Sequence, residues 1–391
     1  MSGPTPFNST FGALPTTIFE LMSQLAMQHG SINLGQGFPD KELEGPASMK
    51  EAAYRFTIDG SNQYPPMAGL PEVRQALAAH SERYTGLALD WKTQVLITSG
   101  ATEALAAAFF GLLEPGDEVI LFAPLYDSYV PIVERAGAKA VVLPLQAPDW
   151  HFDREEVAAA FSSKTKLIVV NTPHNPTGKV FTEEELAFLA ELVVKHDAYA
   201  LLDEVYEHLV FPGFKHVTMR ALPGMEDRCL RIGSAGKTFS FTAWKVGWVT
   251  GPPAAVAAAA KAHQFLTFTV PSAYQHAVAV GLEQERAFYE GLGPLLEKKR
   301  DWLAKELTEI GFKILPGQGT YFLVADFSGL LPEGSDEDDV SFCSRLTVDG
   351  GVTLIPVSAS KAPRNLVRFV ICKTDEKLEA AVQKLRAYLA A

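Results

Sequence analysis

The chain has 391 residues, of which 47% are hydrophobic and 20% are charged. These proportions are ordinary for a globular protein with a sizeable core, and they exclude a largely disordered chain. With 34 Lys and Arg against 46 Asp and Glu, the net charge is −12, which argues against a general binder of nucleic acid or anionic membranes. The three cysteines, Cys229, Cys343 and Cys372, are far apart, so they predict neither a disulfide framework nor a CxxC metal site.

The sequence also lacks the usual signals of export and membrane insertion. The first basic residue is Lys41, so no charged region precedes an apolar stretch as in a secretory signal peptide. The longest apolar runs, such as 104–113, are shorter than the ~20 residues that a membrane-spanning helix needs. Together with the few cysteines, which suit a reducing compartment, these features predict a cytoplasmic protein.

Residues 1–40 are rich in Pro, Gly and Thr, and from residue 95 onward short apolar runs alternate with helical stretches. Helices are expected over 101–113 and from Thr182 to about His196, where Thr-Glu-Glu-Glu has the spacing of a capping box. Continuous apolar strands separated by helices predict an α/β fold with a mostly parallel sheet that is covered on both faces. The expected strands are 95–98, 119–122, 141–143, 166–171, 198–202, 230–232 and 246–250.

The carboxyl-terminal part predicts a smaller α/β unit. Its expected elements are a helix over 294–310, a strand over 321–327, an acidic loop near 336–339, strands over 352–355 and 366–372, and a closing helix from Asp375. We expect a division into an N-terminal segment, 1–45, which packs on the small domain, a large domain, 46–285, and a small domain, 286–391.

Four polar segments lie at the predicted strand ends, where parallel sheets bind their ligands. They are Ser99–Thr102, the sequence NTPHNPTG at 171–178, the sequence DEVY at 203–206, and SAGKTFS at 234–240 with KVGW at 245–248. No HExxH motif is present and the nine histidines show no ligand spacing, so we predict no metal.

In this order, the last three of these segments, at 171–178, 203–206 and 234–248, resemble motifs of the fold-type I pyridoxal-phosphate-dependent class I/II aminotransferases. The chain is most similar to the methionine, glutamine and kynurenine aminotransferase group, also known as cysteine-conjugate β-lyases, and the resemblance covers essentially the whole chain. It implies a three-layer large domain with a seven-stranded, mostly parallel sheet. It also implies pyridoxal 5′-phosphate as the cofactor and a homodimer with its two sites at the interface.

The resemblance assigns a role to each reactive side chain around the cofactor ring. Lys237 would hold pyridoxal phosphate as a Schiff base and then move the α-proton as general base and acid. Asp203, after an apolar strand, would keep the ring nitrogen protonated, because a buried carboxylate favours the cation. Asn175 and Tyr206 would donate hydrogen bonds to the phenolic oxygen, and Tyr126 would stack on the ring.

The phosphate group needs hydrogen-bond donors and positive charge. Gly100, Ala101 and Thr102 can offer backbone N–H groups at the start of a helix, where the helix dipole also favours an anion. Ser234 adds a hydroxyl and Lys245 adds a cation. The aspartate-aminotransferase pattern has Arg where Lys245 stands, and Lys gives a point charge without the two-donor fork.

Two further residues follow from the resemblance. Tyr64 resembles a tyrosine that reaches the phosphate across the dimer interface. Arg368 lies inside an apolar strand, where a buried guanidinium needs an anionic partner. The resemblance places Arg368 at the substrate α-carboxylate, together with Asn175 and the backbone N–H of Gly37.

The expected side-chain pocket is apolar. Segment 263–270 has no Arg for a distal carboxylate, and Phe19, Phe38 and Phe268 are expected to line the pocket. Such a pocket favours a large neutral L-amino acid, such as methionine, glutamine, an aromatic amino acid or kynurenine, with a 2-oxo acid as the acceptor.

Two alternative functions remain open from the sequence. The same carbanion could eliminate a β-leaving group, which would make the protein mainly a cysteine-S-conjugate β-lyase. A cofactor-sensing domain of a transcription regulator would need a basic helix-turn-helix arm. Residues 1–54 contain no Arg and only Lys41 and Lys50 as cations, which disfavours this second alternative.

Overall fold

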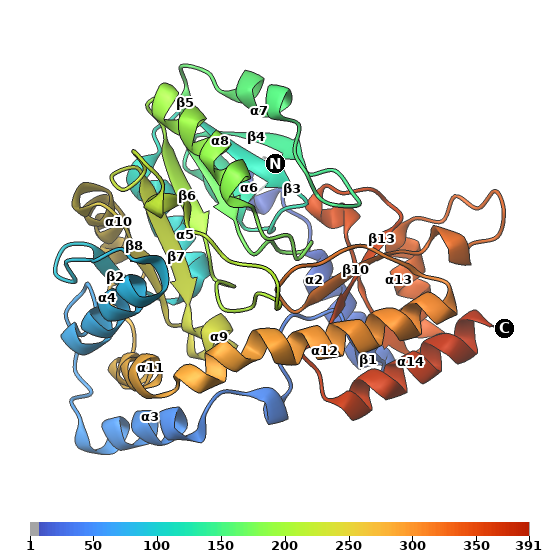
Figure 1. The fold of residues 1–391 in the computed structure, drawn as a ribbon. Coiled ribbons are helices and arrows are strands. Elements are labelled where there is room, and N and C mark those ends of the chain that lie inside the picture. Colours follow the sequence, from blue (N-terminus) through green and yellow to red (C-terminus); the bar gives the residue numbers. More distant parts are fainter. Residues whose placement is uncertain (1–7, 391) are drawn as a thin grey trace, which may run out of the picture.

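The computed structural model describes residues 8–390 and shows an α/β fold around a seven-stranded sheet (Figure 1). In spatial order the strands are β2 (Val95–Thr98), β8 (Gly247–Thr250), β7 (Cys229–Ser234), β6 (Tyr199–Asp203), β5 (Thr165–Asn171), β3 (Glu118–Ala123) and β4 (Lys139–Pro144). Strand β8 is antiparallel to both of its neighbours, and the other pairs are parallel. The predicted fold class is confirmed, and every predicted strand of this sheet is present.

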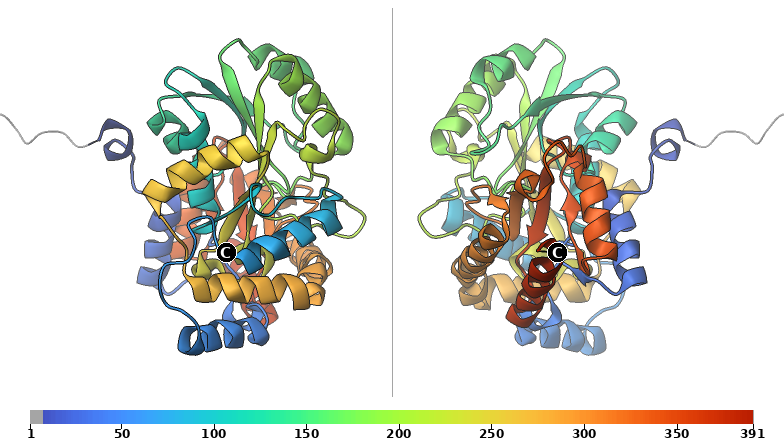
Figure 2. Two further views of the ribbon diagram at one scale, coloured as in Figure 1. Left: turned by 90° about the vertical axis from the view of Figure 1, so that its left-hand side faces the viewer. Right: turned by 90° about the vertical axis from the view of Figure 1, so that its right-hand side faces the viewer.

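Both faces of this sheet are buried. Successive side chains of a strand point to opposite faces, and here the two sets pack into two apolar clusters. In β3, Val119 and Leu121 belong to one apolar cluster, whereas Ile120 and Phe122 belong to another. Helices cover the sheet on both sides (Figure 2). Those of the first cluster are α5 (Gly100–Leu112), α6 (Tyr129–Arg135) and α10 (Pro253–Leu266), and those of the second are α7 (Arg154–Ala160) and α8 (Glu183–Lys195).

Helix α8 begins with the predicted capping box, in which Thr182 and Glu185 bond each other's backbone N–H groups. Beside the β2 edge, α11 packs against both α3 and α4. The bounds of the remaining helices in this part are α3 (Ala47–Asp59), α4 (Pro71–Thr85), α9 (Ala235–Thr238) and α11 (Ser272–Gln284), with short 3-10 turns at Lys41–Leu43, Met219–Ala221 and Thr242–Trp244.

Helix α12 (Arg286–Ile310) begins well before the predicted start at Pro294 and leads from the large sheet into the carboxyl-terminal region (Figure 1). Proline has no N–H, so the carbonyl of Glu290 loses its helical partner. Glu290 is exposed, and water can therefore replace that bond. Gly293 lies against Val210, where a Cβ would be 2.1 Å from the carbonyl oxygen, so the helix packs closely on that segment just before the proline.

The carboxyl-terminal region holds a second, antiparallel sheet in the order β12-β13-β10-β9. Its strands are β9 (Lys313–Ile314), β10 (Phe322–Asp326), β12 (Ile355–Pro356) and β13 (Leu366–Val370). The predicted strand over 352–355 is wrong in one respect, because it is divided between two sheets. Its first half, β11 (Val352–Thr353), pairs with β1 (Ile32–Asn33). A uniform apolar run carries no signal of a partner that lies some 300 positions away in the sequence.

Helix α13 (Asp339–Val348) follows the predicted acidic loop and was missed from the sequence. The acidic residues include its N-cap, because Asp338 Oδ1 accepts from the Ser341 N–H at 2.9 Å. The last helix, α14 (Asp375–Leu389), begins where predicted and packs on α12. Two 3-10 turns, Ser328–Leu330 and Ser358–Ser360, complete this region.

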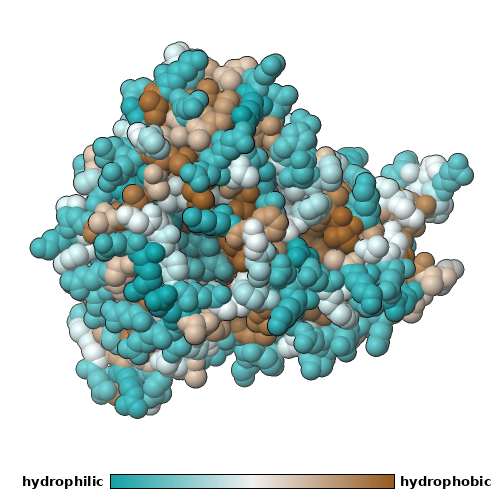
Figure 3. Space-filling model, viewed as in Figure 1, coloured by the Kyte–Doolittle hydropathy of each residue, from teal (hydrophilic) through white to brown (hydrophobic). Residues whose placement is uncertain are grey.

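The described part of the N-terminal segment contacts both regions. Helix α2 (Ile18–His29) contacts α13, whereas the short helix α1 (Ser9–Gly12), which precedes it, contacts α6. Residues 1–7 of the predicted segment lie outside the described residues, and the division at 45 and 285 stays a prediction. Polar side chains predominate on the face seen in Figure 3. Of the helices within residues 8–390, none is both long and apolar enough to span a membrane.

Candidate active site

A cavity of about 410 Å³ lies where the carboxyl ends of the parallel strands meet the segments that follow them. Because β8 runs in the opposite direction, its amino end reaches the same edge of the sheet. The predicted residues that line this cavity are Phe19, Gly37, Phe38, Gly100, Ala101, Thr102, Tyr126, Asn175, Asp203, Tyr206, Ser234, Lys237, Lys245 and Arg368.

Lys237 is the amine of the cavity, carried by the short helix α9 directly after β7. Its Nζ donates a hydrogen bond to Tyr321 Oη at 2.6 Å. Burial lowers the pKa of Lys237 to about 8, because an apolar environment disfavours the ammonium. The neutral amine, which can attack a carbonyl carbon or accept a proton, is therefore more abundant near neutral pH than it is for an ordinary lysine.

Asp203 ends β6 and is 5% exposed. Its Oδ2 accepts a hydrogen bond from Tyr129 Oη at 2.5 Å, and its backbone carbonyl accepts one from the Asn171 side chain at 2.9 Å. Burial is the main cause that raises the pKa of Asp203, because it destabilises the unpaired carboxylate. A cation held against this carboxyl group would favour its ionised form.

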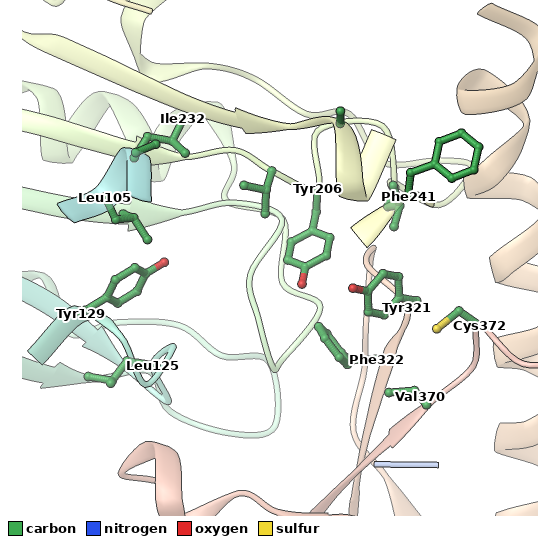
Figure 4. Packing of buried hydrophobic residues seen from close by; sticks show 14 of the residues in the cluster. Leu105, Leu125, Tyr129, Tyr206, Ile232, Phe241, Tyr321, Phe322, Val370 and Cys372 are labelled. Atoms are coloured by element: carbon green, nitrogen blue, oxygen red, sulfur yellow. The ribbon is translucent and has the colours of Figure 1, made fainter. Parts of the chain in front are cut away.

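Tyr206 is buried beside Tyr321 and Phe322, with ring centroids 5.4 and 5.9 Å from theirs. The hydroxyl groups of Tyr206 and Tyr321 point into the space between the two rings (Figure 4). Asn175 lines the same cavity as Tyr206, and its backbone N–H donates to Asn171 Oδ1 at 2.8 Å. The Tyr206 hydroxyl and the Asn175 amide are therefore available as donors on one side of the cavity, whereas the Tyr321 hydroxyl donates to the Gly37 carbonyl at 2.7 Å.

Arg368 is a buried cation from β13, in the middle of the smaller sheet. Its Nη2 donates to the Gly35 carbonyl at 2.9 Å, its Nη1 donates to Asn175 Oδ1 at 3.2 Å, and its Nε has no hydrogen-bond partner. The rings of Phe19 and Phe322 lie 5.1 and 4.3 Å from the guanidinium.

Within residues 8–390 no carboxylate forms an ion pair with Arg368. Burial lowers the pKa of Arg368 to about 10. A buried guanidinium without a counter-charge is costly, and a planar carboxylate would match its two-donor geometry. Arg368 is therefore suited to bind a carboxylate that enters the cavity.

The opposite end of the cavity can hold an anion such as a phosphate. Gly100 has a φ of +74° at the start of α5, and a Cβ there would lie 3.0 Å from Lys245 Nζ. A Cβ on Gly247 would lie 2.6 Å from the backbone carbon of Gly100. Both glycines therefore keep this end open. The helix start and the Lys245 ammonium supply the donors and the charge that an anion needs.

Two predicted site residues, Tyr64 and Phe268, do not line the cavity of this chain. Their side chains are 80% and 42% exposed, and their ring centroids lie 5.3 Å apart in an edge-to-face contact. We call this pair the Tyr64–Phe268 patch.

Tyr321, Tyr129 and Asn171 were missed as site residues. Tyr321 was noted only as the start of a strand, and Asn171 only as the end of a strand and the first residue of the 171–178 motif, without a role of its own. Tyr129 follows Tyr126 by three residues in Tyr-Asp-Ser-Tyr, and this repeated tyrosine could have drawn attention to it. Their contacts join residues that are far apart in the sequence.

The structure also groups histidines and glutamates in a way that the sequence did not predict. The two groups are His80, Glu207 and His208, and Glu204, Glu207 and His216. Arg231 donates to Glu204 at 2.5 Å and to Glu207 at 3.0 Å, so it neutralises the carboxylates that a metal ion would need. We therefore assign no metal to either group.

Comparison with known proteins agrees with this geometry. The family model of aminotransferase class I and II matches residues 30–385. A methionine aminotransferase of Escherichia coli is 41% identical over 376 residues, which cover 95% of this chain and 96% of that protein. A kynurenine–oxoglutarate transaminase of Dictyostelium discoideum is 38% identical over 420 residues, covering 98% of this chain and 95% of that protein.

Among solved structures, an N-succinyldiaminopimelate aminotransferase from Mycobacterium tuberculosis superposes with a TM-score of 0.93. It is 42% identical to this chain, and the match covers 97% of this chain and 99% of the other. Both sequence and fold therefore match over nearly the full length. This chain belongs to the class I and II aminotransferases and is a transaminase that uses pyridoxal 5′-phosphate.

Proposed function

We propose that the amino donor is a large neutral L-amino acid, such as methionine, glutamine, an aromatic amino acid or kynurenine, and that a 2-oxo acid accepts the amino group in a ping-pong reaction. The observation that carries this proposal is the charge of the cavity. Among its lining residues the cations are Lys237, Lys245 and Arg368, and each has a role that every donor requires. The acidic Asp127 also lines the cavity, so a distal carboxylate would meet no free cation there.

The cofactor fits the cavity through contacts at both of its ends. Gly100, Ala101, Thr102, Ser234 and Lys245 would hold its phosphate, since the open cradle at Gly100 and Gly247 leaves room for one. Asp203 would hold the ring nitrogen as a cation, Tyr126 would stack on the ring, and Asn175 and Tyr206 would donate to the phenolic oxygen. When bound, pyridoxal phosphate supplies an electron sink and carries the amino group.

The chain itself moves the proton and orients the substrate. Lys237 Nζ would accept the proton from the substrate α-carbon, which its pKa of about 8 allows near neutral pH. Arg368 would bind the α-carboxylate, with the Asn175 side chain and the Gly37 backbone N–H as further donors. This fixes the α-carbon beside Nζ and leaves the donor side chain against Phe19 and Phe38.

A homodimer would complete the site. The Tyr64–Phe268 patch exposes two aromatic side chains at a distance from the cavity of its own chain. In the proposed dimer each patch contributes to the cavity of the partner, with Tyr64 near the phosphate and Phe268 near the donor side chain. The three cysteines are free and buried, which is consistent with the predicted cytoplasmic location.

A donor panel tests the proposal. Methionine, glutamine, phenylalanine, kynurenine, aspartate and N-succinyldiaminopimelate are each compared as kcat/KM with a panel of 2-oxo acids. Methionine or an aromatic donor should exceed aspartate by about two orders of magnitude or more, since each ~1.4 kcal/mol corresponds to a factor of ten. Equal values for aspartate, or a clear preference for N-succinyldiaminopimelate, would contradict the proposed donor class.

The same assays address the β-lyase alternative, for which the comparisons give no separate support. Pyruvate release from a cysteine S-conjugate is measured with and without a 2-oxo acid. If release without the oxo acid is faster than transamination of methionine, β-elimination is the main activity.

A further inference from the structure

A tyrosine outside the predicted set, Tyr321, joins Lys237 to the segment around Gly37 through hydrogen bonds. Tyr321 lies next to β10 and is 2% exposed. Its hydroxyl accepts from Lys237 Nζ at 2.6 Å and donates to the Gly37 carbonyl at 2.7 Å. Its one hydrogen is thus directed at Gly37, which leaves its oxygen as an acceptor for the amine.

The surroundings of Lys237 Nζ favour its position beside the Tyr321 hydroxyl. Nζ lies 5.6 Å from the ring centre of Tyr206 and 5.3 Å from that of Tyr321, so two aromatic faces are within range of the cation. Within residues 8–390, no carboxylate forms an ion pair with Lys237. The Tyr321 oxygen is the one hydrogen-bond acceptor of the amine among the described side chains.

The segment on the other side of Tyr321 is held at two points. Tyr321 bonds the Gly37 carbonyl, and Arg368 bonds the Gly35 carbonyl at 2.9 Å. A Cβ on Gly37 would lie 3.0 Å from the Phe322 ring, so the segment is closely packed against β10. Movement of this segment would therefore displace the Tyr321 hydroxyl and, with it, the amine.

We propose that Tyr321 is a positioning residue that binds the Lys237 amine whenever the amine is not bonded to the cofactor, and that it links the amine to the Gly35–Phe38 segment. The inference rests on the proposed role of Lys237. Because the Tyr321 oxygen accepts a hydrogen bond from the ammonium, it favours the charged amine and opposes the effect of burial. Tyr321 thus keeps a proton on Nζ between its removal from one carbon and its delivery to another.

The first test uses cofactor-free protein and follows a titration. Wild type, Tyr321→Phe and the control Tyr84→Phe are mixed with pyridoxal phosphate over the neutral to alkaline range, and imine formation is followed by absorbance. Tyr84 is a tyrosine bonded to Glu290, away from the cavity lining. The pH at which imine formation is half-maximal should fall by about one unit in Tyr321→Phe alone. The reason is that loss of a hydrogen bond to the Lys237 ammonium should change its deprotonation equilibrium about tenfold or more.

The variant should then capture the aldehyde faster at neutral pH, because more of its amine is neutral. A purely structural role of the ring would not shift the midpoint, since Phe keeps the ring contacts with Tyr206 and Phe322. Equal midpoints in all three proteins would overturn the inference. Borohydride reduction and mass spectrometry identify the modified lysine, and modification elsewhere than Lys237 would refute the proposed function instead.

The second test needs no variant, so it does not depend on the folding of Tyr321→Phe. The wild-type holoenzyme is crystallised with α-methylmethionine, which displaces the lysine but has no α-hydrogen to lose. Lys237 Nζ should lie within hydrogen-bond distance of Tyr321 Oη, and Tyr321 should keep its bond to Gly37. A released amine that points away from Tyr321 would overturn the inference.

Discussion

The cavity and the Tyr64–Phe268 patch differ in how completely one chain builds them. Lys237 and Asp203 reach the cavity from one edge of the large sheet, and Arg368 reaches it from β13 of the smaller sheet. Tyr64 and Phe268 meet each other, but they remain exposed and apart from that cavity. Intramolecular packing therefore explains the first set, whereas the second set has a role only in the dimer that we propose.

The two regions also differ in what they would contribute, since the cavity holds the groups that perform the reaction and the patch would help to retain the cofactor. Burial shifts the pKa values of three groups of the cavity, Asp203, Lys237 and Arg368. Changes in the cavity should consequently damage the reaction itself, whereas a change in the patch should weaken cofactor retention and leave the reaction steps intact.

The largest effect should come from Lys237→Ala. The variant loses both the amine that anchors the cofactor and the group that moves the α-proton. Turnover of methionine should fall by about three orders of magnitude or more, and the absorption band of the lysine-bound cofactor should disappear. Lys261→Ala, an exposed lysine on α10, is the matched control. Near-normal turnover in Lys237→Ala would remove the basis of the proposed site.

A smaller but strong effect is expected for Asp203→Asn. The amide oxygen can still accept from Tyr129, so the fold should be retained, but a neutral group cannot stabilise a cation at the ring nitrogen. Turnover should fall about 100-fold, equivalent to ~2.7 kcal/mol. Thermal unfolding checks the fold, and Asp197→Asn, at an 88% exposed side chain, is the control. Full activity in Asp203→Asn would refute this role.

Arg368→Lys should affect all donors alike, because the α-carboxylate is common to them. Lys keeps the charge but lacks the planar pair of donors, so kcat/KM should fall by about 10- to 100-fold for methionine and aspartate equally. The ratio between the two donors is the informative measurement. If the variant changes that ratio strongly, Arg368 contacts the donor side chain rather than the α-carboxylate.

Much of the cavity could be predicted from the sequence because its residues follow strands directly. Asp203, Ser234 and Asn175 lie at or just after apolar runs, and the ends of parallel strands share one edge of the sheet. Lys237 follows in the same way on the next helix. These placements depend on local pattern and on sheet topology, which apolar runs and helix signals indicate well.

Other features depend on contacts between distant segments, and the sequence has no local signal for them. Tyr321 joins Lys237 to Gly37, and these residues lie in three separate parts of the chain. The division of residues 352–355 between two sheets depends on β1, close to the other terminus. Pro294 gave a misleading local signal, because proline removes only one helical hydrogen bond here and helix α12 continues through it.

The smallest effect should come from the patch and tests whether it belongs to a partner's cavity. Tyr64→Phe removes one hydroxyl that, in the proposed dimer, donates to the phosphate of the neighbouring site. Loss of one hydrogen bond to a charged group should weaken cofactor binding about tenfold. The rate with saturating cofactor should change little, because Lys237, Asp203 and Arg368 are untouched. Equilibrium dialysis of the cofactor gives the affinity, and Tyr54→Phe, another exposed tyrosine, is the control.

The oligomeric state tests whether Tyr64 acts across a dimer interface or within its own chain. Light scattering should show a dimer for wild type and for Tyr64→Phe alike, because the loss of one hydroxyl changes little in a whole interface. Mixing Tyr64→Phe with an inactive Lys237→Ala partner should then produce hybrids with one site that has both Lys237 and a donated Tyr64. Such a site should bind cofactor with wild-type affinity. A monomer that is fully active, or hybrids without any such site, would show that the patch does not act across an interface.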